Sequence, residues 1–298
     1  MITVENVSFS YPDGPEILHD VNLQIKDGEF VAIMGENGAG KTTLIKMFNG
    51  LLKPDEGRVL IDGTPTKTPP KKLHRFRVHR DVDRSVAQLS RNVGLIFQNP
   101  DHQLFAETVA EELAFSLRNF GFSEDVTQRR ITSLLTALDL DRYASSSPFI
   151  LSGGERKRVA LAAVLAWDPK HVVMDEPTIG QDFLQKDRLR NFIVQLESQG
   201  KTVIIVTHDI EFVAECKPRV VLLSQGRVIG DGPAVNILTN STLIDRASLV
   251  MPQIASLMNN LQELHAPPDI IDAYSAREFL RDKLHKVQSV EGLRTGGQ

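Results

Sequence analysis

Short apolar runs rich in valine and isoleucine recur along the chain, and turn residues bound most of them. The clearest runs are residues 30–34, 93–97, 172–174, 203–206 and 220–223. Between most of them apolar residues return at helical spacing, so strands and helices are expected to alternate. Continuous apolar strands are typical of a parallel sheet buried on both faces. The pattern predicts an α/β fold built on a mostly parallel sheet.

The start of the chain shows a different periodicity, in which apolar and polar positions alternate. The apolar positions are Ile2, Val4, Val7 and Phe9, and then Val21, Leu23 and Ile25. A Pro-Asp-Gly turn at residues 12–14 separates the two groups. This alternation predicts two half-buried strands of an antiparallel β subdomain.

A helical pattern without a buried-strand run covers residues 107–140. We expect a mostly helical subdomain, spanning about residues 107–165, to be inserted into the α/β core. An α/β core of residues 1–232 would then contain both the sheets and this subdomain.

After residue 232 the apolar residues again fall at helical spacing. Helices are expected at residues 252–264 and near residues 276–287, with two prolines between them. Residues 233–298 are therefore predicted to form a small C-terminal helical appendage. Its last residues, 292–298, are expected to be disordered.

Composition narrows the function only slightly. Of the 298 residues, 41% are hydrophobic and 24% charged, which is the balance of an ordinary globular domain. The net charge of −4 gives no general attraction to nucleic acid, so no nucleic-acid partner is expected. The single cysteine, Cys216, excludes an internal disulfide. Since no run approaches the ~18–20 apolar residues of a membrane span, any membrane role is expected to come through a partner.

A glycine-rich loop follows the apolar run at residues 30–34. It matches the pattern G-x-x-x-x-G-K-[ST] and comprises Gly35, Glu36, Asn37, Gly38, Ala39, Gly40, Lys41 and Thr42, with Thr43 next. A strand before this loop and a helix after it are the context that a phosphate-binding loop requires. Glycines let backbone N–H groups face the phosphates, Lys41 neutralises phosphate charge, and Thr42 offers a hydroxyl to Mg²⁺.

Two acidic residues, Asp175 and Glu176, end the apolar run at residues 172–174. Asp175 is the candidate for contact with Mg²⁺, directly or through water. Glu176 points the other way along the pleat and is the candidate for polarising an attacking water. The alternative is that Glu176 is a solvated charge at a strand end.

A third element comprises Ser152, Gly153, Gly154 and Glu155 before the helical run at residues 156–166. Taken alone, a serine and two glycines here indicate a helix-capping turn. A second phosphate-binding helix start is the other interpretation, and the acidic strand about twenty residues later favours it.

These three elements, in this order, resemble those of an ATP-binding cassette (ABC) ATPase over about residues 1–230. The resemblance implies that Tyr11 stacks on adenine, Gln98 reaches Mg²⁺, and His208 contacts the γ-phosphate. It also implies that Asp182 belongs to a loop linking two active sites.

The family resemblance implies a head-to-tail dimer with a second ABC ATPase subunit. Each ATP would lie between residues 35–43 of one chain and residues 152–155 of the other. Lys41, Glu176 and His208 are then the expected catalytic residues, with ATP and Mg²⁺ as the cofactors.

Residues 97–105, followed by Thr108 and Val109, are similar to the ATPases of energy-coupling-factor (ECF) and cobalt-type importers. A segment resembling residues 249–261 also follows the cassette in that group. This resemblance implies a transmembrane coupling subunit, and through it a membrane subunit that binds vitamins or transition-metal ions. The chain would then lie peripherally at the cytoplasmic face of the cell membrane.

Other ABC classes fit the sequence less well. A DNA-maintenance ATPase would carry a long coiled coil, and no sustained heptads occur here. A translation factor would carry two cassettes, and one P-loop is present. The alternative that the chain is the ATPase of an exporter or of another importer stays open, although residues 99–105 favour the ECF class.

The sequence departs from the family pattern at Glu155, where glutamine is usual, and at Gln181, where leucine is usual. These departures leave homodimer and heterodimer open. Residues 64–91 also form a longer connection than usual and are rich in lysine and arginine. The connection is interpreted as a solvated surface insertion, with attraction to anionic lipid headgroups as the alternative.

Overall fold

The computed structural model describes residues 1–67, 89–261 and 266–295. Most of the basic connection predicted at residues 64–91 therefore lies outside the described residues. No helix in the described ranges is long and apolar enough to cross a bilayer.

The larger sheet has six strands in the order β10-β9-β3-β8-β7-β6. The strands are β3 (Phe30–Met34), β6 (Val93–Ile96), β7 (His171–Asp175), β8 (Thr202–Val206), β9 (Arg219–Ser224) and β10 (Arg227–Pro233). All neighbours pair in parallel except β10, which runs antiparallel to β9. Every residue of β3, β7 and β8 is buried, which confirms the prediction of a parallel sheet covered on both faces.

The smaller sheet is antiparallel, in the order β2-β1-β4-β5. Its strands are β1 (Ile2–Ser10), β2 (Glu16–Ile25), β4 (Glu56–Ile61) and β5 (Thr64–Pro65). The alternating apolar residues of β1 and β2 are buried, as the sequence pattern predicts. Strand β4 was not predicted, because its first three residues, Glu56-Gly57-Arg58, are exposed and carry no apolar signal.

Helix α1 (Lys41–Phe48) lies between the two sheets. Leu44, Ile45 and Phe48 share one core with β1, β2 and one face of the larger sheet. The other face of that sheet is covered by α6 (Phe183–Ser198) and α7 (Ile210–Cys216). Successive strand residues such as Ile33 and Met34 enter opposite cores, as the two-residue period of a strand requires.

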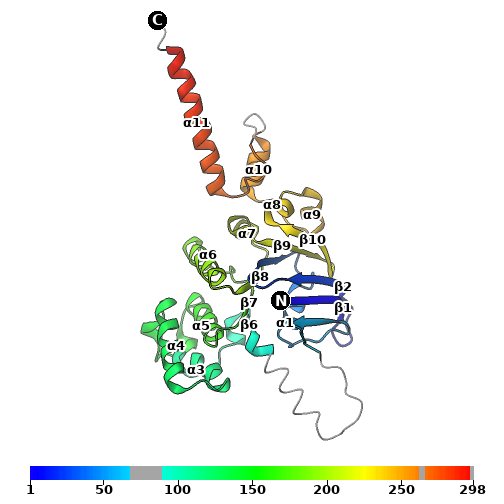
Figure 1. Cartoon of the computed structure of the whole chain (residues 1–298), viewed down its shortest axis with the longest axis vertical. Coiled ribbons are helices and arrows are strands. Elements are labelled where there is room, and N and C mark those ends of the chain that lie inside the picture. Colours follow the sequence, from blue (N-terminus) through cyan, green and yellow to red (C-terminus); the bar gives the residue numbers. More distant parts are fainter. Residues whose placement is uncertain (68–88, 262–265, 296–298) are drawn as a thin grey trace.

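Three helices inserted between β6 and β7 form a separate subdomain (Figure 1). They are α3 (Val109–Asn119), α4 (Glu124–Ala137) and α5 (Gly153–Leu165), with short 3₁₀ helices at Pro100–His102, Asp141–Tyr143 and Pro148–Ile150. Thr108, Ser123 and Ser152 cap the starts of α3, α4 and α5 by accepting backbone N–H groups. The subdomain has its own apolar core, in which Leu113, Leu117 and Val159 are fully buried.

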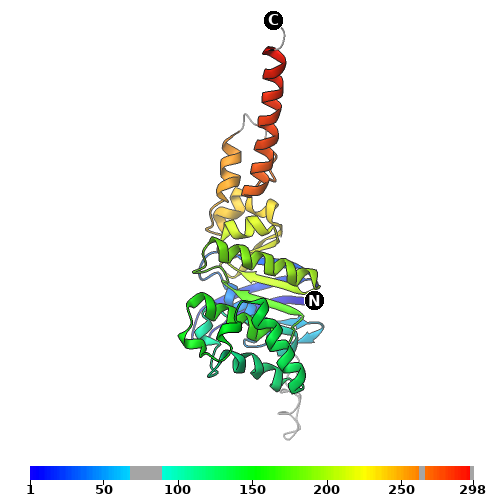
Figure 2. The same cartoon turned by 90° about the vertical axis from the view of Figure 1, so that its left-hand side faces the viewer.

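The chain after β10 forms α8 (Ala234–Leu238), α9 (Ser241–Arg246), α10 (Gln253–Asn260) and α11 (Ala273–Thr295). Figures 1 and 2 show α10 and α11 projecting from the end of the molecule opposite α3 and α4. Met258, Ile270 and Ala276 pack together where α10 and α11 meet.

Two sequence predictions differ from the structure in this appendage. Helix α10 starts after Pro252, which lacks an N–H and serves as the N-cap, but it ends at Asn260 rather than at residue 264. Helix α11 begins before residue 276 and runs to Thr295, so residues 292–295 are helical instead of disordered. Residues 262–265 and 296–298 lie outside the described residues.

Candidate nucleotide site

The glycine-rich loop joins the end of β3 to the start of α1. Gly35 and Gly40 have φ angles of +147° and +97°, which favour glycine. A Cβ on Gly35 would lie 1.9 Å from the carbonyl oxygen of Leu223, and one on Gly40 would lie 2.6 Å from a methyl carbon of Leu18. The loop therefore requires glycine at both positions, and it leads into the N-terminus of α1, a position suited to binding a phosphate.

Lys41 is buried at the first position of α1. Its ammonium group donates to the carbonyl oxygens of Gly35 at 2.8 Å and Glu36 at 2.7 Å, which holds the cation over the loop. Burial lowers the pKa of Lys41, while the carboxylates of Glu176, Asp175 and Glu36 oppose that shift. The loop thus holds a cation where phosphate oxygens would lie.

Thr42 and Asp175 meet across the site from α1 and the end of β7. The Thr42 hydroxyl donates to the two carboxylate oxygens of Asp175 at 3.2 and 3.0 Å. Burial raises the pKa of Asp175, and the Thr42 hydrogen bond acts against that rise. A hydroxyl and a carboxylate side by side fit Mg²⁺, because this ion prefers oxygen ligands.

Glu176 follows β7 in a left-handed backbone conformation, with φ of +48°. Its N–H donates to the carbonyl of Val206 at 2.8 Å, which fixes the turn against the end of β8. One carboxylate oxygen lies 2.9 Å from Nδ1 of His208. A left-handed non-glycine residue beside a half-exposed histidine is the kind of strained geometry that clusters at functional sites.

One open pocket of about 390 Å³ brings most of the predicted site residues together. It is lined by Tyr11, Asn37, Gly38, Gly40, Lys41, Thr42, Thr43, Gln98, Glu176 and His208, and also by Ile17 and Ile179. The Tyr11 hydroxyl lies 3.2 Å from the hydroxyl of Thr43, and its ring packs edge-on against Phe9. An exposed aromatic ring therefore lies beside the phosphate loop.

Two loop residues do not face the pocket with their side chains. Ala39 is buried in the core under the loop. The carboxylate of Glu36 turns toward the end of the molecule that carries the appendage, and it accepts from Ser248 at 3.2 Å and Ser224 at 3.5 Å. Any contact that Glu36 or Ala39 makes with a nucleotide is therefore restricted to their backbone groups.

The Ser152–Glu155 turn lies outside this pocket. Ser152 caps α5, and the Glu155 carboxylate accepts from the Ser152 N–H at 2.9 Å and the Ser152 hydroxyl at 2.7 Å. A hydrogen bond from the Tyr143 hydroxyl, with those from Ser152, lowers the pKa of Glu155 to about 2. Glu155 and Ser152 thus form a capping box, so both sequence interpretations of this turn fit its geometry.

Gly153 and Gly154 line a shallow groove together with Gln98, Ile179 and Gly180. Asp182 caps α6 by accepting the Gln185 N–H at 2.8 Å. None of the predicted in-trans residues lines the pocket of its own chain within the described ranges.

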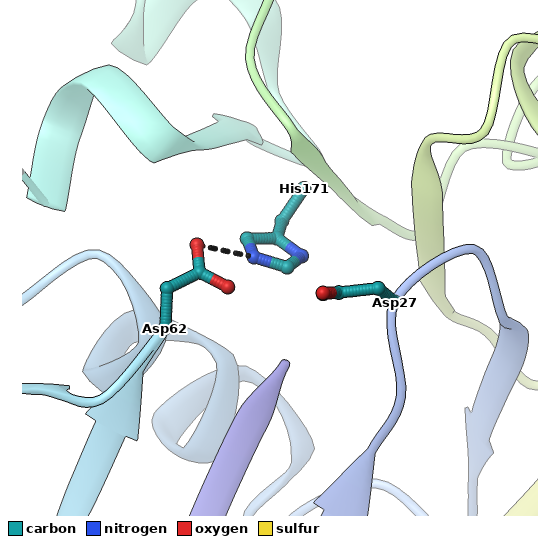
Figure 3. Close-up of side chains that lie close together, drawn as sticks. All are labelled: Asp27, Asp62 and His171. Carbon is teal, nitrogen blue, oxygen red and sulfur yellow. Dashed lines mark hydrogen bonds and ion pairs between the residues drawn. The ribbon is translucent and has the colours of Figure 1, made fainter.

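The sequence analysis missed a polar cluster at the opposite end of β7 (Figure 3). Nε2 of the buried His171 lies 3.1 Å from Asp62, and the Lys170 ammonium bonds Asp62 at 2.7 Å and Asp27 at 2.9 Å. The amino group of Met1 bonds the same two carboxylates. Two ammonium groups balance two carboxylates, so this cluster is a charge-neutral network tying three turns together. Its members come from separate turns, and no local motif signals them.

Comparison with known proteins agrees with the ATP-binding site that the geometry indicates. The model of the ABC transporter family matches residues 18–179. The energy-coupling factor transporter ATP-binding protein EcfA of Methanothermobacter thermautotrophicus is 40% identical over 262 residues, covering 88% of this chain and 80% of that protein. A putative ABC transporter ATP-binding protein of Pyrococcus furiosus is 45% identical over 228 residues, covering 76% of this chain and 82% of that protein.

Two solved structures share the fold. The structure of cbiO1 from Clostridium perfringens, part of the ABC transporter complex cbiONQ, has a TM-score of 0.70 at 34% identity and covers 87% of this chain and 98% of its own. The ATP-binding cassette MJ0796, a dimer bound to ADP and phosphate, has a TM-score of 0.68 at 31% identity and covers 78% of this chain and 99% of its own. With the family model matching more than half of its residues, this chain belongs to the ABC transporter family as an ATP-binding cassette.

Proposed function

We propose that this chain is the ATP-hydrolysing subunit of an ECF or cobalt-type importer, which takes up vitamins or transition-metal ions. The observation that carries the proposal is the convergence of Lys41, Thr42, Glu176 and His208 on one pocket, with Asp175 hydrogen-bonded to Thr42. The similarity to EcfA, an energy-coupling factor transporter ATP-binding protein, and to cbiO1 of the transporter complex cbiONQ supports the choice of importer class.

ATP enters as the substrate, with its phosphates on the glycine-rich loop and its adenine against the ring of Tyr11. When bound, Mg²⁺ would neutralise phosphate charge, held by Thr42, Asp175 and Gln98. Glu176 accepts a proton from the attacking water, and His208 contacts the γ-phosphate while it holds one oxygen of Glu176. The adjacent acids thus take separate roles in one hydrolytic step.

A second cassette completes each site in this proposal. Residues Ser152 to Glu155 and Asp182 would act across the dimer on the nucleotide of the other chain. Phe183 is 78% exposed and Leu184 is 58% exposed directly after Asp182. Such exposed apolar side chains beside the cap of α6 favour burial against another protein chain.

A membrane partner is proposed for the surface that follows Gln98. Phe105 and Phe115 are half exposed and stack edge to face, with ring centroids 4.6 Å apart. The buried Glu112 carboxylate accepts from the N–H groups of Phe105 at 2.9 Å and Ala106 at 2.8 Å, so this loop is fixed before any partner binds. Closure of the dimer would move this aromatic surface together with a transmembrane coupling subunit docked on it.

Through the coupling subunit the chain would also serve a substrate-binding membrane subunit, and it would lie peripherally at the cytoplasmic face of the membrane. The test is purification of the tagged chain from its native membrane in mild detergent. We expect a second ATPase subunit and a multi-span coupling subunit to be recovered with it. A control carrying Phe105→Asp and Phe115→Asp should lose the coupling subunit and keep ATPase activity. Recovery of the wild-type chain without any membrane subunit would contradict the importer assignment.

A further inference from the structure

The segment of residues 97–105 leads from the larger sheet into the helical subdomain. Just before it, Leu95 and Ile96 of β6 pack in the two cores on either side of the sheet. Near its other end, Leu104 is 4% exposed and packs in the separate core of the subdomain. The boundary between the two bodies therefore falls within this segment, and Gln98, which lines the nucleotide pocket, lies close to it.

Apolar packing between the sheet and the subdomain is incomplete. A cavity of about 110 Å³ is bounded by Ile96 and Met174 of the sheet, Leu161 of α5, and Leu189 and Phe192 of α6. A void forfeits the dispersion contacts that would otherwise hold its walls together. Apolar contact therefore holds the subdomain to the sheet less firmly here than a filled core would, and polar contacts across the boundary matter more.

One side chain crosses this boundary with a hydrogen bond on each side. The amide oxygen of Gln103 accepts from the backbone N–H of Phe97 at 3.3 Å, and its amide nitrogen donates to the carbonyl oxygen of Ala160 at 3.1 Å. Phe97 directly follows β6, and Ala160 is fully buried in the middle of α5. Since Phe97 offers a donor and Ala160 an acceptor, a side-chain amide satisfies both.

The residues between the two ends of this bridge are attached to α5 as well. Asn99 accepts the Asp101 N–H at 3.0 Å and so caps the short helix at Pro100–His102. The Asp101 carboxylate lies 3.1 Å from Nε of Arg156 on α5. Gln103 carries this attachment on to the backbone of Phe97, the residue next to Gln98.

We propose that Gln103 is a positioning residue for ATP hydrolysis, which ties the backbone beside Gln98 to α5. Without the bridge, the backbone at residues 97–99 gains freedom, and a displaced functional group costs rate even when the chemistry is intact. Gln103 does not line the nucleotide pocket within the described ranges, so it acts through Gln98. The inference rests on the proposed role of Gln98 and deepens it.

Kinetics of the full chain test the bridge. Gln103→Met keeps the length of the side chain and removes both hydrogen bonds, so kcat should fall roughly three- to tenfold while KM for ATP stays within about twofold. Gln103→Glu, when ionised, keeps the acceptor for Phe97 and loses the donor for Ala160, so its kcat should fall as well. Gln128→Met is the matched control, because it makes the same change at an exposed position of α4 in the same subdomain. A wild-type kcat in either Gln103 variant would overturn the proposal.

A double-mutant cycle tests whether Gln103 acts through Gln98. Gln98→Ala should lower kcat by itself, and adding Gln103→Met to it should change kcat by less than about twofold, because the group to be positioned is already gone. If the two losses multiply, Gln103 serves the fold of the subdomain and not the placement of Gln98, and the proposal is wrong.

Hydrogen exchange over residues 97–105 gives a readout that does not depend on activity. The Phe97 amide should exchange faster in Gln103→Met than in the wild type, and Gln128→Met should leave it unchanged. Thermal unfolding shows that each variant is folded, and Gln103→Glu replaces Gln103→Met in these comparisons if the latter does not fold. Unchanged exchange in a folded Gln103→Met would mean that the bridge is absent in solution.

The outcome is separable from the proposed function. If Gln98→Ala hydrolyses ATP like the wild type, the role of Gln98 itself is wrong and the inference falls with it. If Gln98→Ala is slow while Gln103→Met matches the wild type, only the positioning role of Gln103 is wrong.

Discussion

Asp175 and Glu176 are neighbours in the sequence, yet their carboxyl groups contact different partners. Asp175 ends β7 and accepts from the Thr42 hydroxyl, beside the phosphate loop. Glu176 leaves the strand in a left-handed conformation and faces His208. A backbone turn of one residue therefore separates a candidate metal-binding acid from a candidate general base.

The role of Glu176 predicts a separation of binding from turnover. Glu176→Gln should reduce phosphate release by about 10² to 10⁴, the usual contribution of a general base. ATP affinity should change little, because the hydrogen bonds of Glu176 go to His208 and Val206 and not to the phosphate loop. Steady-state phosphate release and an ATP titration measure the two quantities. Release near the wild-type rate would disprove the assignment.

Replacing Lys41 should instead weaken the binding of ATP. Lys41→Ala removes a charge-assisted phosphate contact worth about 1.5–3 kcal/mol, so ATP affinity should fall roughly 10- to 150-fold. Lys53→Ala is the control, since this lysine is exposed and lies outside the pocket-lining set. Thermal unfolding of the variant is needed beside the titration, because Lys41 also bonds two loop carbonyls. An unchanged ATP affinity would contradict the hypothesis that this loop binds the phosphates of ATP.

At the scale of elements, the start of α5 depends on Glu155. Its carboxylate accepts from Ser152 and Tyr143, and these bonds hold its pKa at about 2, below the ordinary 4.5. A pKa lowered by folding means that the contribution to stability is complete above pH 4.5 and is lost as the pH falls through about 2. The cap of α5 should therefore be acid-sensitive.

Glu155→Gln tests this cap, and it restores the residue that is usual in the family. The variant should be less stable to unfolding than the wild type at pH 7, because an amide oxygen accepts the hydrogen bonds of Ser152 and Tyr143 more weakly than a carboxylate does. The difference from the wild type should shrink as the pH falls from 4.5 toward 2, where the wild-type carboxylate also takes up a proton. Urea unfolding across that range measures it. A difference that does not depend on pH would mean that the charge is irrelevant to the cap.

The sequence predicted well those features that depend on residues close together along the chain. Apolar runs located the buried strands, and the phosphate loop and acidic strand end were found because their chemistry is local. Strand β4 escaped because its exposed first half gives no apolar signal and its pairing with β1 joins segments far apart in the sequence. The Tyr143–Glu155 bond and the His171 cluster escaped for the same reason, since packing of separate turns creates them.

At the scale of the whole molecule, the appendage is joined to the nucleotide site at two points. Ser248 donates to Glu36 of the phosphate loop, and the N–H of Gln253 donates to Glu211 of α7, which follows His208. Helices α8 and α9 pack in the main core, where Leu238 and Ala247 are fully buried. The elements on the two sides of residue 232 therefore share a core, which Ala255 of α10 also joins. Beyond that contact α10 and α11 project from the body (Figure 2).

The projecting helices carry exposed apolar side chains, among them Leu257, Tyr274 and Leu284. We predict that this surface holds two ATPase subunits together while the nucleotide sites open. A chain ending at Asp272 should therefore fold and bind ATP, but it should be a monomer when no ATP is present. This cut keeps the ion pair between Lys217 and Asp272 and spares the core helices.

A charge placed on the same surface should act like the truncation, because burying an unpaired carboxylate in an apolar contact is costly. Leu257→Asp is expected to give monomers in ATP-free buffer, whereas Leu51→Asp, at a side chain of similar exposure on the ATPase body, should leave the dimer intact. Light scattering without nucleotide distinguishes the two states. If the truncated chain and Leu257→Asp are as dimeric as the wild type, α10 and α11 pack only on their own cassette, and the subunits meet elsewhere.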